Sequence, residues 1–342
     1  MRSRCVTSLV GLLFLGMVVG EPVESMAGEP FRVMFYNVEN LFDCLHDTLK
    51  ADHEFLPQSA RAWTPYRYRT KLTLTAQTII ASGTGHVPAL VGLCEVENPH
   101  CLDDLTRHSP LREADYRYVM TDSPDERGID VALLYQRSRF KLLWHRSLRV
   151  PGGRLHRQPT RDILHVAGLL LSGDTLDVFV CHLPSRSGGA EQSEPYRLLA
   201  AEVLRAGVDS LFLTRQDAHI VIMGDFNDYP DSRSVRQVLG ARKPRGKVDP
   251  HTLYNLMDGR RGGTYRYRGV WATLDQFIVS GSLLRSEGGV RTSYERARIL
   301  AHPFLLLEDN HYGGLSPFRT YQGFKYQGGY SDHLPVCCDF DL

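Results

Sequence analysis

The sequence predicts an α/β protein in which two mixed β-sheets pack face to face and helices flank them, a four-layer sandwich. Apolar, strand-like runs alternate with helical segments along the chain, which indicates an α/β architecture. Some runs are joined by short polar turns, as in residues 164–184 across Ser172, Gly173 and Asp174, and such hairpins argue against a purely parallel sheet. No internal repeat or linker interrupts the pattern, so we expect residues 28–342 to form a single domain.

The individual elements follow from local sequence patterns. Strands are expected where apolar runs are bounded by polar or turn residues, and the last of them begins directly after Asp332 and His333. In chain order the expected strands are 31–41, 89–98, two within 116–135, the two arms of 164–184, 218–228, 273–284 and 334–340. Helical spacing predicts helices at 69–83, with Gly83 as the stop, and at 194–213.

The first 27 residues have the order of a secretory signal peptide. Two arginines precede an apolar run at 6–20, and Ser25, Met26 and Ala27 form a small-x-small cleavage site. The alternative is an uncleaved anchor, but the run is shorter than the roughly 20 residues that a bilayer span needs. We therefore expect residues 1–27 to be removed, and the mature protein to be secreted or periplasmic without stable membrane insertion.

Composition excludes some classes of protein. The chain has 342 residues, 42% of them hydrophobic, with 40 Lys and Arg against 39 Asp and Glu, which is neither a disordered nor a polyelectrolyte composition. A nucleic-acid substrate would have to bind through a local basic patch, because a net charge of +1 provides no long-range attraction. The cysteines suggest neither a disulfide framework nor a CxxC metal site, and Cys337 and Cys338 are expected to be buried thiols.

Carboxylates, amides and histidines recur where predicted strands end. Each has an ordinary alternative, such as a turn, a helix N-terminus or loop packing, but the recurrence of the same residue types favours one shared cleft at a sheet edge. These residues are Asn37 and Glu39 after 33–36, Glu95, His182, Asp225 and Asn227 after their strands, Asp275, and the pair Asp332 and His333 before the last strand.

The donor set favours a hard cation. Oxygen ligands without thiolates, and with few histidines, suit Mg²⁺ or Mn²⁺ better than zinc. A histidine with a carboxylate partner can transfer a proton or stabilise negative charge. Neither a GxSxG elbow nor a P-loop occurs in the sequence. Together these features predict the metal-dependent hydrolysis of a phosphate ester.

Six motifs, in this order, resemble those of the endonuclease/exonuclease/phosphatase superfamily, the fold of pancreatic-type deoxyribonuclease and of exonuclease III-like repair enzymes. The resemblance extends from Phe31 to Phe340, and the longer tyrosine-rich segments at 263–277 and 317–336 look like those of exported bacterial members. The motifs are FYNVENLF, GLCEVEN, VCHLPSR, MGDFND, LDQFIVS and YSDHLPV.

The resemblance implies a role for each of these residues. It makes Glu95 the principal metal ligand, with Asn37 beside it and Asp332 as a second metal-side carboxylate. It implies that Asp225 activates the attacking water and that Asn227 binds the scissile phosphate. In the same way, His333 would contact the phosphate, held by Asp275, and His182 would be a second catalytic histidine.

The middle of the chain is harder to assign. Arg127 is a candidate for binding phosphate, and Asp130 is either a partner of His182 or an acid at a strand edge. Arg186, in a glycine-rich loop, either binds a phosphate oxygen or is a solvated loop residue. Arg197 on the following helix is a weaker candidate.

The substrate is the least determined feature. Residues 63–71 and 263–271 interleave Arg or Lys with aromatic residues, a composition that suits DNA or RNA and equally suits amphipathic strands with snorkelling arginines. We expect a monomeric phosphodiesterase, with a nuclease as the first hypothesis. The alternatives are the same site acting on a lipid or small-molecule phosphate ester, and an inactive binding module on this scaffold.

Overall fold

The computed structural model describes residues 30–152, 159–285 and 289–342. The predicted signal peptide lies outside these ranges. Within them, no helix is both long and apolar enough to cross a membrane. All six cysteines in these ranges are free thiols, and Cys337 and Cys338 are buried.

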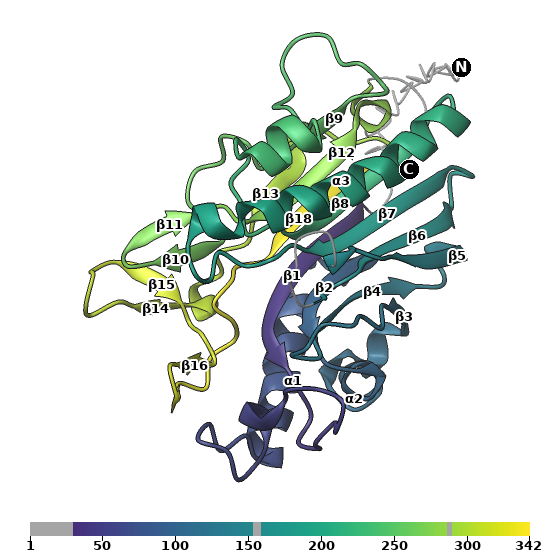
Figure 1. Cartoon of the computed structure of the whole chain (residues 1–342). Helices are drawn as coiled ribbons and strands as arrows, with labels where there is room; N and C mark the ends of the chain where they lie inside the picture. Colours follow the sequence, from purple (N-terminus) through teal and green to yellow (C-terminus); the bar gives the residue numbers. More distant parts are fainter. Residues whose placement is uncertain (1–29, 153–158, 286–288) are drawn as a thin grey trace, which may run out of the picture.

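Two six-stranded mixed sheets form the centre of the molecule (Figure 1). β1 runs parallel to β2 and β7 parallel to β8, whereas the other neighbours in both sheets are antiparallel. The first sheet has the order β13 (Ala297–Ile299), β18 (Val336–Phe340), β1 (Phe31–Leu41), β2 (Leu90–Val96), β4 (Asp130–Gln136), β3 (Tyr116–Met120). The second has the order β5 (Phe140–Leu148), β6 (Ile163–Leu170), β7 (Thr175–His182), β8 (His219–Asp225), β12 (Asp275–Ser280), β9 (Leu253–Asn255).

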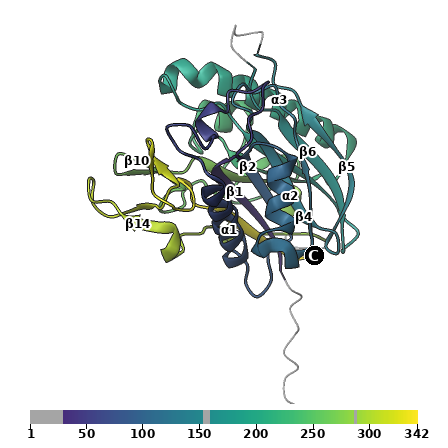
Figure 2. The ribbon, with the colours of Figure 1, turned by 90° about the horizontal axis from the view of Figure 1, so that it is seen from below.

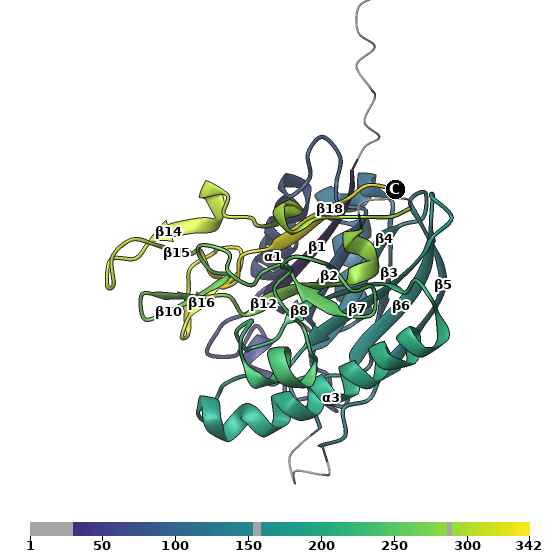
Figure 3. The ribbon, with the colours of Figure 1, turned by 90° about the horizontal axis from the view of Figure 1, so that it is seen from above.

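Helices cover the outer faces of the two sheets (Figures 2 and 3). α1 (Pro65–Ala81) and α2 (Pro99–Arg107) share a hydrophobic cluster with one face of the first sheet, and α3 (Ala190–Thr214) shares another with the second sheet. A third cluster, which contains Phe35, Val178 and Phe277, lies between the sheets. The layers are therefore helix, sheet, sheet, helix, and the predicted four-layer sandwich is confirmed.

Three small hairpins project from the sandwich beside the end of β1 (Figure 1). They are β10–β11 (Tyr265–Tyr267, Val270–Ala272), β14–β15 (Leu306–Glu308, Leu315–Pro317) and β16–β17 (Tyr321–Gln322, Lys325–Tyr326). The remaining short elements are a π-helical turn at Ser234–Val238 and 3₁₀ turns at His53–Phe55, Pro110–Ala114, Gly281–Leu284, Tyr294–Arg296 and Pro303–Leu305.

The structure corrects two local expectations. Residues 63–71 form neither an amphipathic strand nor a nucleic-acid surface at the predicted cleft, because α1 begins at Pro65, where Thr64 caps it by accepting from the N–H of Arg67. β1 has the expected bounds 31–41, so Asn37 lies within the strand and not beyond a strand end, as the pattern of polar residues after apolar runs suggested.

Candidate active site

The parallel pair β7–β8 brings two predicted residues to one rim of the second sheet. His182 ends β7, Asp225 ends β8, and the two are paired in register. On the other side of β8, Asp275 begins the antiparallel strand β12 and is also in register with Asp225. The strand-end pattern in the sequence therefore corresponds to one row of neighbouring residues.

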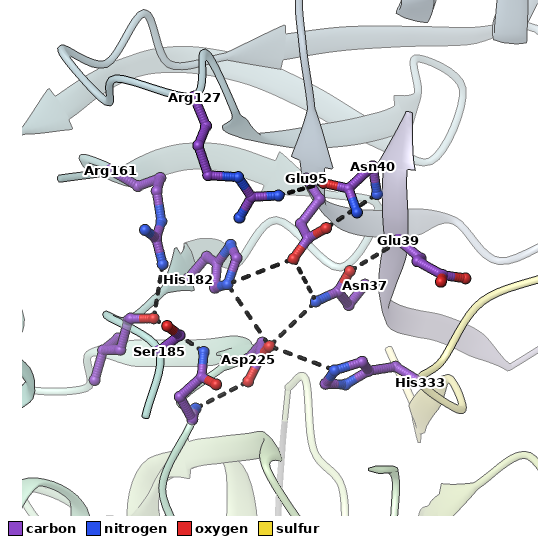
Figure 4. A network of polar contacts seen from close by, with 12 residues as sticks. Asn37, Glu39, Asn40, Glu95, Arg127, Arg161, His182, Ser185, Asp225 and His333 are labelled. Carbon is purple, nitrogen blue, oxygen red and sulfur yellow. Dashed lines mark hydrogen bonds and ion pairs between the residues drawn. The ribbon is translucent and has the colours of Figure 1, made fainter. Parts of the chain in front are cut away.

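Asp225 is the centre of a buried polar network (Figure 4). Its Oδ2 accepts from Asn37 Nδ2 at 3.1 Å, and its Oδ1 accepts from the backbone N–H of Asn227 at 2.9 Å. Burial, and to a lesser degree the negative charge of Asp275, raise the pKa of Asp225 to about 7 against the opposing charge of His333. A carboxyl group in this state can take up a proton near neutral pH.

Two histidines face the same oxygen of Asp225. The Nε2 atoms of His182 and His333 each lie 3.7 Å from Oδ2. The Nδ1 of His333 is hydrogen-bonded to Asp275 Oδ2 at 2.7 Å, which fixes the orientation of the ring. Although burial opposes it, the carboxylates of Asp275 and Asp225 raise the pKa of His333 well above its usual value. These two carboxylates therefore favour the imidazolium form of His333.

His182 is in the opposite electrostatic environment. Its Nδ1 is buried and has no hydrogen-bond partner in the described part of the chain. Burial, together with the positive charges of Arg161 and Arg127, lowers the pKa of His182 well below its usual value. This environment favours the neutral form of the ring, whose Nε2 is directed toward Asp225 and toward Glu95 Oε1 at 3.9 Å (Figure 4).

Glu95 presents one carboxylate oxygen to this network. Its backbone has φ +63°, a left-handed conformation that is uncommon for a non-glycine residue, and its Oε2 accepts from the backbone N–H of Asn40 at 3.0 Å. Oε1 faces Asn37 Nδ2 at 3.5 Å and lines the main cleft. Strand β2 thus places a fixed carboxylate on the opposite side of the cleft from His333.

The cleft has a volume of about 1070 Å³. Its lining includes eight residues with assigned or candidate functions: Glu95, Arg127, His182, Arg186, Asp225, Asn227, Asp332 and His333. Asn227 has φ +50° and donates from Nδ2 to the carbonyl of Leu183 at 3.1 Å, so its amide is held at the wall of the cleft.

A family model described as the Endonuclease/Exonuclease/phosphatase family matches residues 32–341. The chain belongs to this family. Members hydrolyse phosphate esters and generally depend on a divalent metal ion, so the protein is a phosphoester hydrolase. No curated protein matches the sequence itself.

Three solved structures illustrate which proteins share this fold. A humanised D. rerio TDP2 has 16% identity and a TM-score of 0.55, covering 92% of this chain and 99% of its own. The human Nocturnin catalytic domain has 18% identity and a TM-score of 0.54, covering 91% and 94%. A mannosyl-6-phosphatase of Bacteroides thetaiotaomicron has 14% identity and a TM-score of 0.56, covering 91% and 100%. At these identities the likeness shows the fold alone.

A divalent cation of the kind that the endonuclease/exonuclease/phosphatase family uses fits beside Glu95. The Oε1 atom is a hard oxygen donor at a polar cleft, and the neighbouring carboxylate is that of Asp225. Asp225, Asp275 and His333 also bring ligand-type atoms within 4.8 Å of one another. In that group, however, His333 Nδ1 already binds Asp275, which suits a charge-stabilised histidine better than a metal ligand.

Asn37 and Asp332, both expected on the metal side, have other partners. Asn37 Oδ1 accepts from the backbone N–H of Glu39 at 3.0 Å, so its NH₂ group faces the carboxylates of the cleft and orients them. Asp332 Oδ2 accepts from Arg319 at 2.8 Å. The guanidinium of Arg319 thus neutralises Asp332, which the family resemblance implies is a metal-side carboxylate.

Of the three arginines considered in the sequence analysis, two line the cleft and one does not. Arg127 lines the cleft and donates to Asn40, and Arg186 lines it with its guanidinium 4.9 Å from the ring of Tyr229. Arg197 does not line the cleft, because it is buried in an ion pair with Asp228 at 2.9 Å.

Asp130 is not a partner of His182. It is buried, and its Oδ1 accepts from the side chains of Thr121 and Ser123 and from the N–H of Ser123 at 3.0 Å. The interpretation as a structural acid at a strand edge is the one that the geometry supports. Glu39 also turns away, because its φ of +51° directs the side chain to the backbone N–H of Thr320 at 2.6 Å.

Sequence reasoning missed several residues of the cleft. Arg161 lies between Asp125 at 3.3 Å and the carbonyl of Leu183 at 2.9 Å, next to His182 (Figure 4). The ring of Tyr265 lies 4.9 Å from that of His333. A basic residue beside a predicted strand, as in TRDIL, was the only available signal for Arg161. The tyrosines of 263–271 were noticed for their composition but not for their position.

Proposed function

We propose that this protein is an exported, Mg²⁺-dependent phosphodiesterase whose substrate is a nucleic acid. In this proposal residues 1–27 are a cleaved signal peptide and residues 28–342 are one catalytic domain. The observation that carries the chemistry is the pair of histidines facing one oxygen of Asp225, each with Nε2 at 3.7 Å. One position in the cleft is then surrounded by a proton acceptor (Asp225), a cationic hydrogen-bond donor (His333) and a neutral imidazole (His182).

In the proposed mechanism, Asp225 accepts a proton from the attacking water, because its pKa of about 7 allows it to be ionised at neutral pH and then protonated. His333, held by Asp275, donates hydrogen bonds to a phosphate oxygen as negative charge develops. His182, being neutral, orients the water or the phosphate through Nε2.

Glu95 would hold Mg²⁺ or Mn²⁺, and such an ion would neutralise charge on the phosphate oxygens. The role of Asn37 would be to orient the carboxylates of Glu95 and Asp225, since its NH₂ group contacts both. The amide of Asn227, on the cleft wall, would donate to the scissile phosphate. In this arrangement Asp332 contributes negative charge beside the metal only when Arg319 releases it.

The arginines of the cleft support a phosphodiester substrate. Arg127, Arg161 and Arg186 line the side of the cleft around His182, and a guanidinium matches phosphate geometry. Arg127 and Arg186 form no ion pair with a carboxylate within the described residues. Both are therefore available for backbone phosphates next to the scissile one. The TDP2 of D. rerio, whose fold the chain shares, has been crystallised with a single-strand DNA product.

A small-molecule phosphate ester is the second candidate. The net charge of +1 supplies no long-range attraction for a polyanion, and Arg161 is already paired with Asp125. A single phosphate needs only one or two of the remaining cations.

The two candidates separate in a hydrolysis assay of the chain from Gly28 onward. Plasmid DNA, RNA, bis-p-nitrophenyl phosphate and phosphomonoesters are compared in Mg²⁺, Mn²⁺ and EDTA at increasing salt. A nuclease loses affinity steeply as salt rises, whereas a small-substrate enzyme responds less. Cleavage of nucleic acid that EDTA abolishes supports the proposal, and cleavage of monoesters alone contradicts the choice of substrate.

Glu95→Gln tests the site itself, and Glu97→Gln is its matched control. Glu97 lies two residues further along, but its carboxylate accepts from the backbone N–H of Asp43 at 2.8 Å and does not line the cleft. We expect Glu95→Gln to abolish hydrolysis and to weaken Mn²⁺ binding measured by calorimetry, and Glu97→Gln to retain both. Equal activity in the two variants would show that the chemistry lies elsewhere.

A further inference from the structure

A second groove opens beside the active-site cleft. It has a volume of about 640 Å³ and lies among the three projecting hairpins. Tyr267 and Asp332 line both spaces, so the groove adjoins the cleft at these two residues. A group attached to a phosphate at His333 would reach the groove by passing Tyr267.

The β10–β11 hairpin connects the groove to the catalytic histidine. Tyr265 forms a backbone bridge with His333, and its ring lies 4.9 Å from the imidazole. Tyr267 is two residues further along the same strand, so both rings are on one face and are roughly 7 Å apart along it. This is about the length of one sugar or nucleoside unit beyond the phosphate. Tyr267 is 59% exposed. Within the described ranges, no other aromatic ring packs against its own ring.

The hairpin is held in place by Arg266, a residue that lines the groove. Arg266 is largely buried and donates to Asp309 Oδ2 at 3.0 Å, to the carbonyl of Gly313 at 2.6 Å and to that of Gly269 at 3.1 Å. Tyr312 packs closely against Gly269, where an added Cβ would meet it at 2.9 Å. The groove is therefore preformed rather than assembled by loose loops.

The turn of this hairpin carries an unusual residue. Arg268 and Gly269 have φ +48° and +81°, the left-handed pair of a two-residue hairpin turn that normally selects Asn or Asp followed by Gly. The guanidinium of Arg268 lies 5.2 Å from the ring of Tyr267. It has no carboxylate partner among the described residues. The hairpin therefore presents a cation, from Arg268, and an aromatic ring, from Tyr267, to the groove.

The other side chains of the groove are nearly neutral as a set. Arg266 pairs with Asp309 and Arg319 pairs with Asp332, so two cations and two carboxylates cancel. Glu308 and Lys325, which carry opposite charges, also line the groove together with His311, and its uncharged polar side chains are Asn310, Ser316, Gln322 and Gln327. Aromatic rings with fixed amides suit an uncharged ring that carries hydroxyl or amide groups, not a second phosphate.

We propose that this groove binds the nucleoside or sugar ring attached to the scissile phosphate, stacked on Tyr267. The inference rests on the proposed function, because it takes the phosphate to be bound at His333. It makes Tyr267 a specificity-determining residue. The shared chemistry of its ligand is a hydroxyl-bearing ring on a phosphate, and a nucleoside is the source that the proposed nuclease activity favours.

Three phosphodiesters with one leaving group test this inference. They are p-nitrophenyl esters of methyl phosphate, of thymidine 5′-phosphate and of glucose 6-phosphate. We expect the ratio of kcat/KM for the thymidyl ester to that for the methyl ester to fall about 10-fold or more in Tyr267→Ala, as when a base-stacking ring is removed. Tyr267→Phe should retain the ratio.

Tyr66→Ala is the matched control. Tyr66 belongs to the similar segment at 63–71, is exposed on α1 and lines neither space, so the ratio should not change. A fall in the thymidyl ratio alone identifies a nucleoside, and a fall in the glucosyl ratio alone identifies a sugar. If the parent protein hydrolyses the esters but Tyr267→Ala leaves both ratios unchanged, the inference is wrong and the proposed function stands.

A binding measurement decides the case in which the parent hydrolyses none of the three esters, which would count against the proposed function. Thymidine 5′-phosphate, glucose 6-phosphate and inorganic phosphate are titrated into the parent and Tyr267→Ala by calorimetry. Weaker binding of a ring-bearing phosphate in the variant, with no change for inorganic phosphate, supports the groove. Equal affinities in the two proteins, or no binding to either, overturn it.

Discussion

The two sides of the cleft place a histidine at the same distance from Asp225 but give it opposite properties. On the side of the C-terminal loop, His333 has the carboxylate of Asp275 at Nδ1. On the side of β7, His182 has no partner at Nδ1 in the described structure and has Arg161 and Arg127 nearby. The pKa of His333 is consequently raised and that of His182 is lowered.

The difference teaches that the groups behind the two rings can give them opposite charges although both rings face one carboxylate. Both Nε2 atoms lie 3.7 Å from Asp225, which contributes to the raised pKa of His333, but Asp275 is the larger contributor. A carboxylate behind the ring stabilises the imidazolium, whereas burial with guanidinium groups nearby stabilises the neutral form. One carboxylate can then work with a cation on one side and a neutral base on the other.

Replacing Asp225 removes the carboxylate that both histidines face, and we expect this change to have the largest effect. We expect Asp225→Asn to lower kcat for bis-p-nitrophenyl phosphate by about 1000-fold or more, because both the proton acceptor and the common partner of the histidines are lost. Steady-state kinetics at saturating Mg²⁺ measure the effect, with thermal melting to verify folding. A loss of less than about 10-fold would remove Asp225 from the mechanism.

Asp275→Asn removes the carboxylate at Nδ1 of His333, so that this ring, like that of His182, has no carboxylate behind it. We expect kcat to fall about 10- to 100-fold, with a change in the pH profile. His333 acts when protonated, so activity is lost as pH rises through its raised pKa, and lowering that pKa moves the alkaline limb to lower pH.

Asp177→Asn is the control for this shift. Asp177 and His165 form a buried pair at 2.9 Å that does not line the cleft. This variant should alter stability but leave the alkaline limb in place. An unshifted limb in Asp275→Asn would show that His333 does not act as a cation.

Arg161→Gln tests the electrostatic environment of the other histidine, His182. Loss of a positive charge near His182 should bring its lowered pKa back toward the ordinary value. We expect about a 10-fold decrease in kcat/KM for diesters, since Arg161 also lines the cleft. Proton NMR of His182 measures the pKa shift directly, and an unchanged pKa would show that its lowering is caused by burial and the other positive charges, not by Arg161.

Asp130→Asn should have the smallest effect on activity, less than about 2-fold, because this residue does not contact His182. Its effect is on stability. Burial raises the pKa of Asp130 to about 6 in the folded protein, so the stability it contributes is fully present below its ordinary pKa near 4 and is lost as pH rises through about 6. Urea denaturation should show this decline in the parent and a flatter curve in the variant.

Much of the fold could be predicted from the sequence, because apolar runs, turns and helical spacing are local signals. The hairpin at 164–184 and the helix ending near 213 appear as predicted, as β6, β7 and α3. The ends of β7 and β8 were also local signals, which is why His182 and Asp225 could be named in advance.

What could not be predicted depends on contacts between distant segments. Arg319 reaches Asp332 from the segment between the β14–β15 and β16–β17 hairpins, and Tyr265 forms an isolated backbone bridge with His333, 68 residues further along the chain. Glu39 shares its strand with Asn37 but leaves the cleft because its backbone adopts a positive φ. Neither periodicity nor motif spacing encodes such a reversal, since the strained conformation is stabilised by the surrounding fold.

The most direct test of the account is a pH titration of His182 and His333 by heteronuclear NMR in the chain from Gly28 onward, with His182→Gln and His333→Gln for assignment. The account predicts that at pH 7 the signal of His333 is that of an imidazolium and the signal of His182 is that of a neutral ring. Two histidines that titrate together near pH 6.5, or in the reverse order, would contradict it.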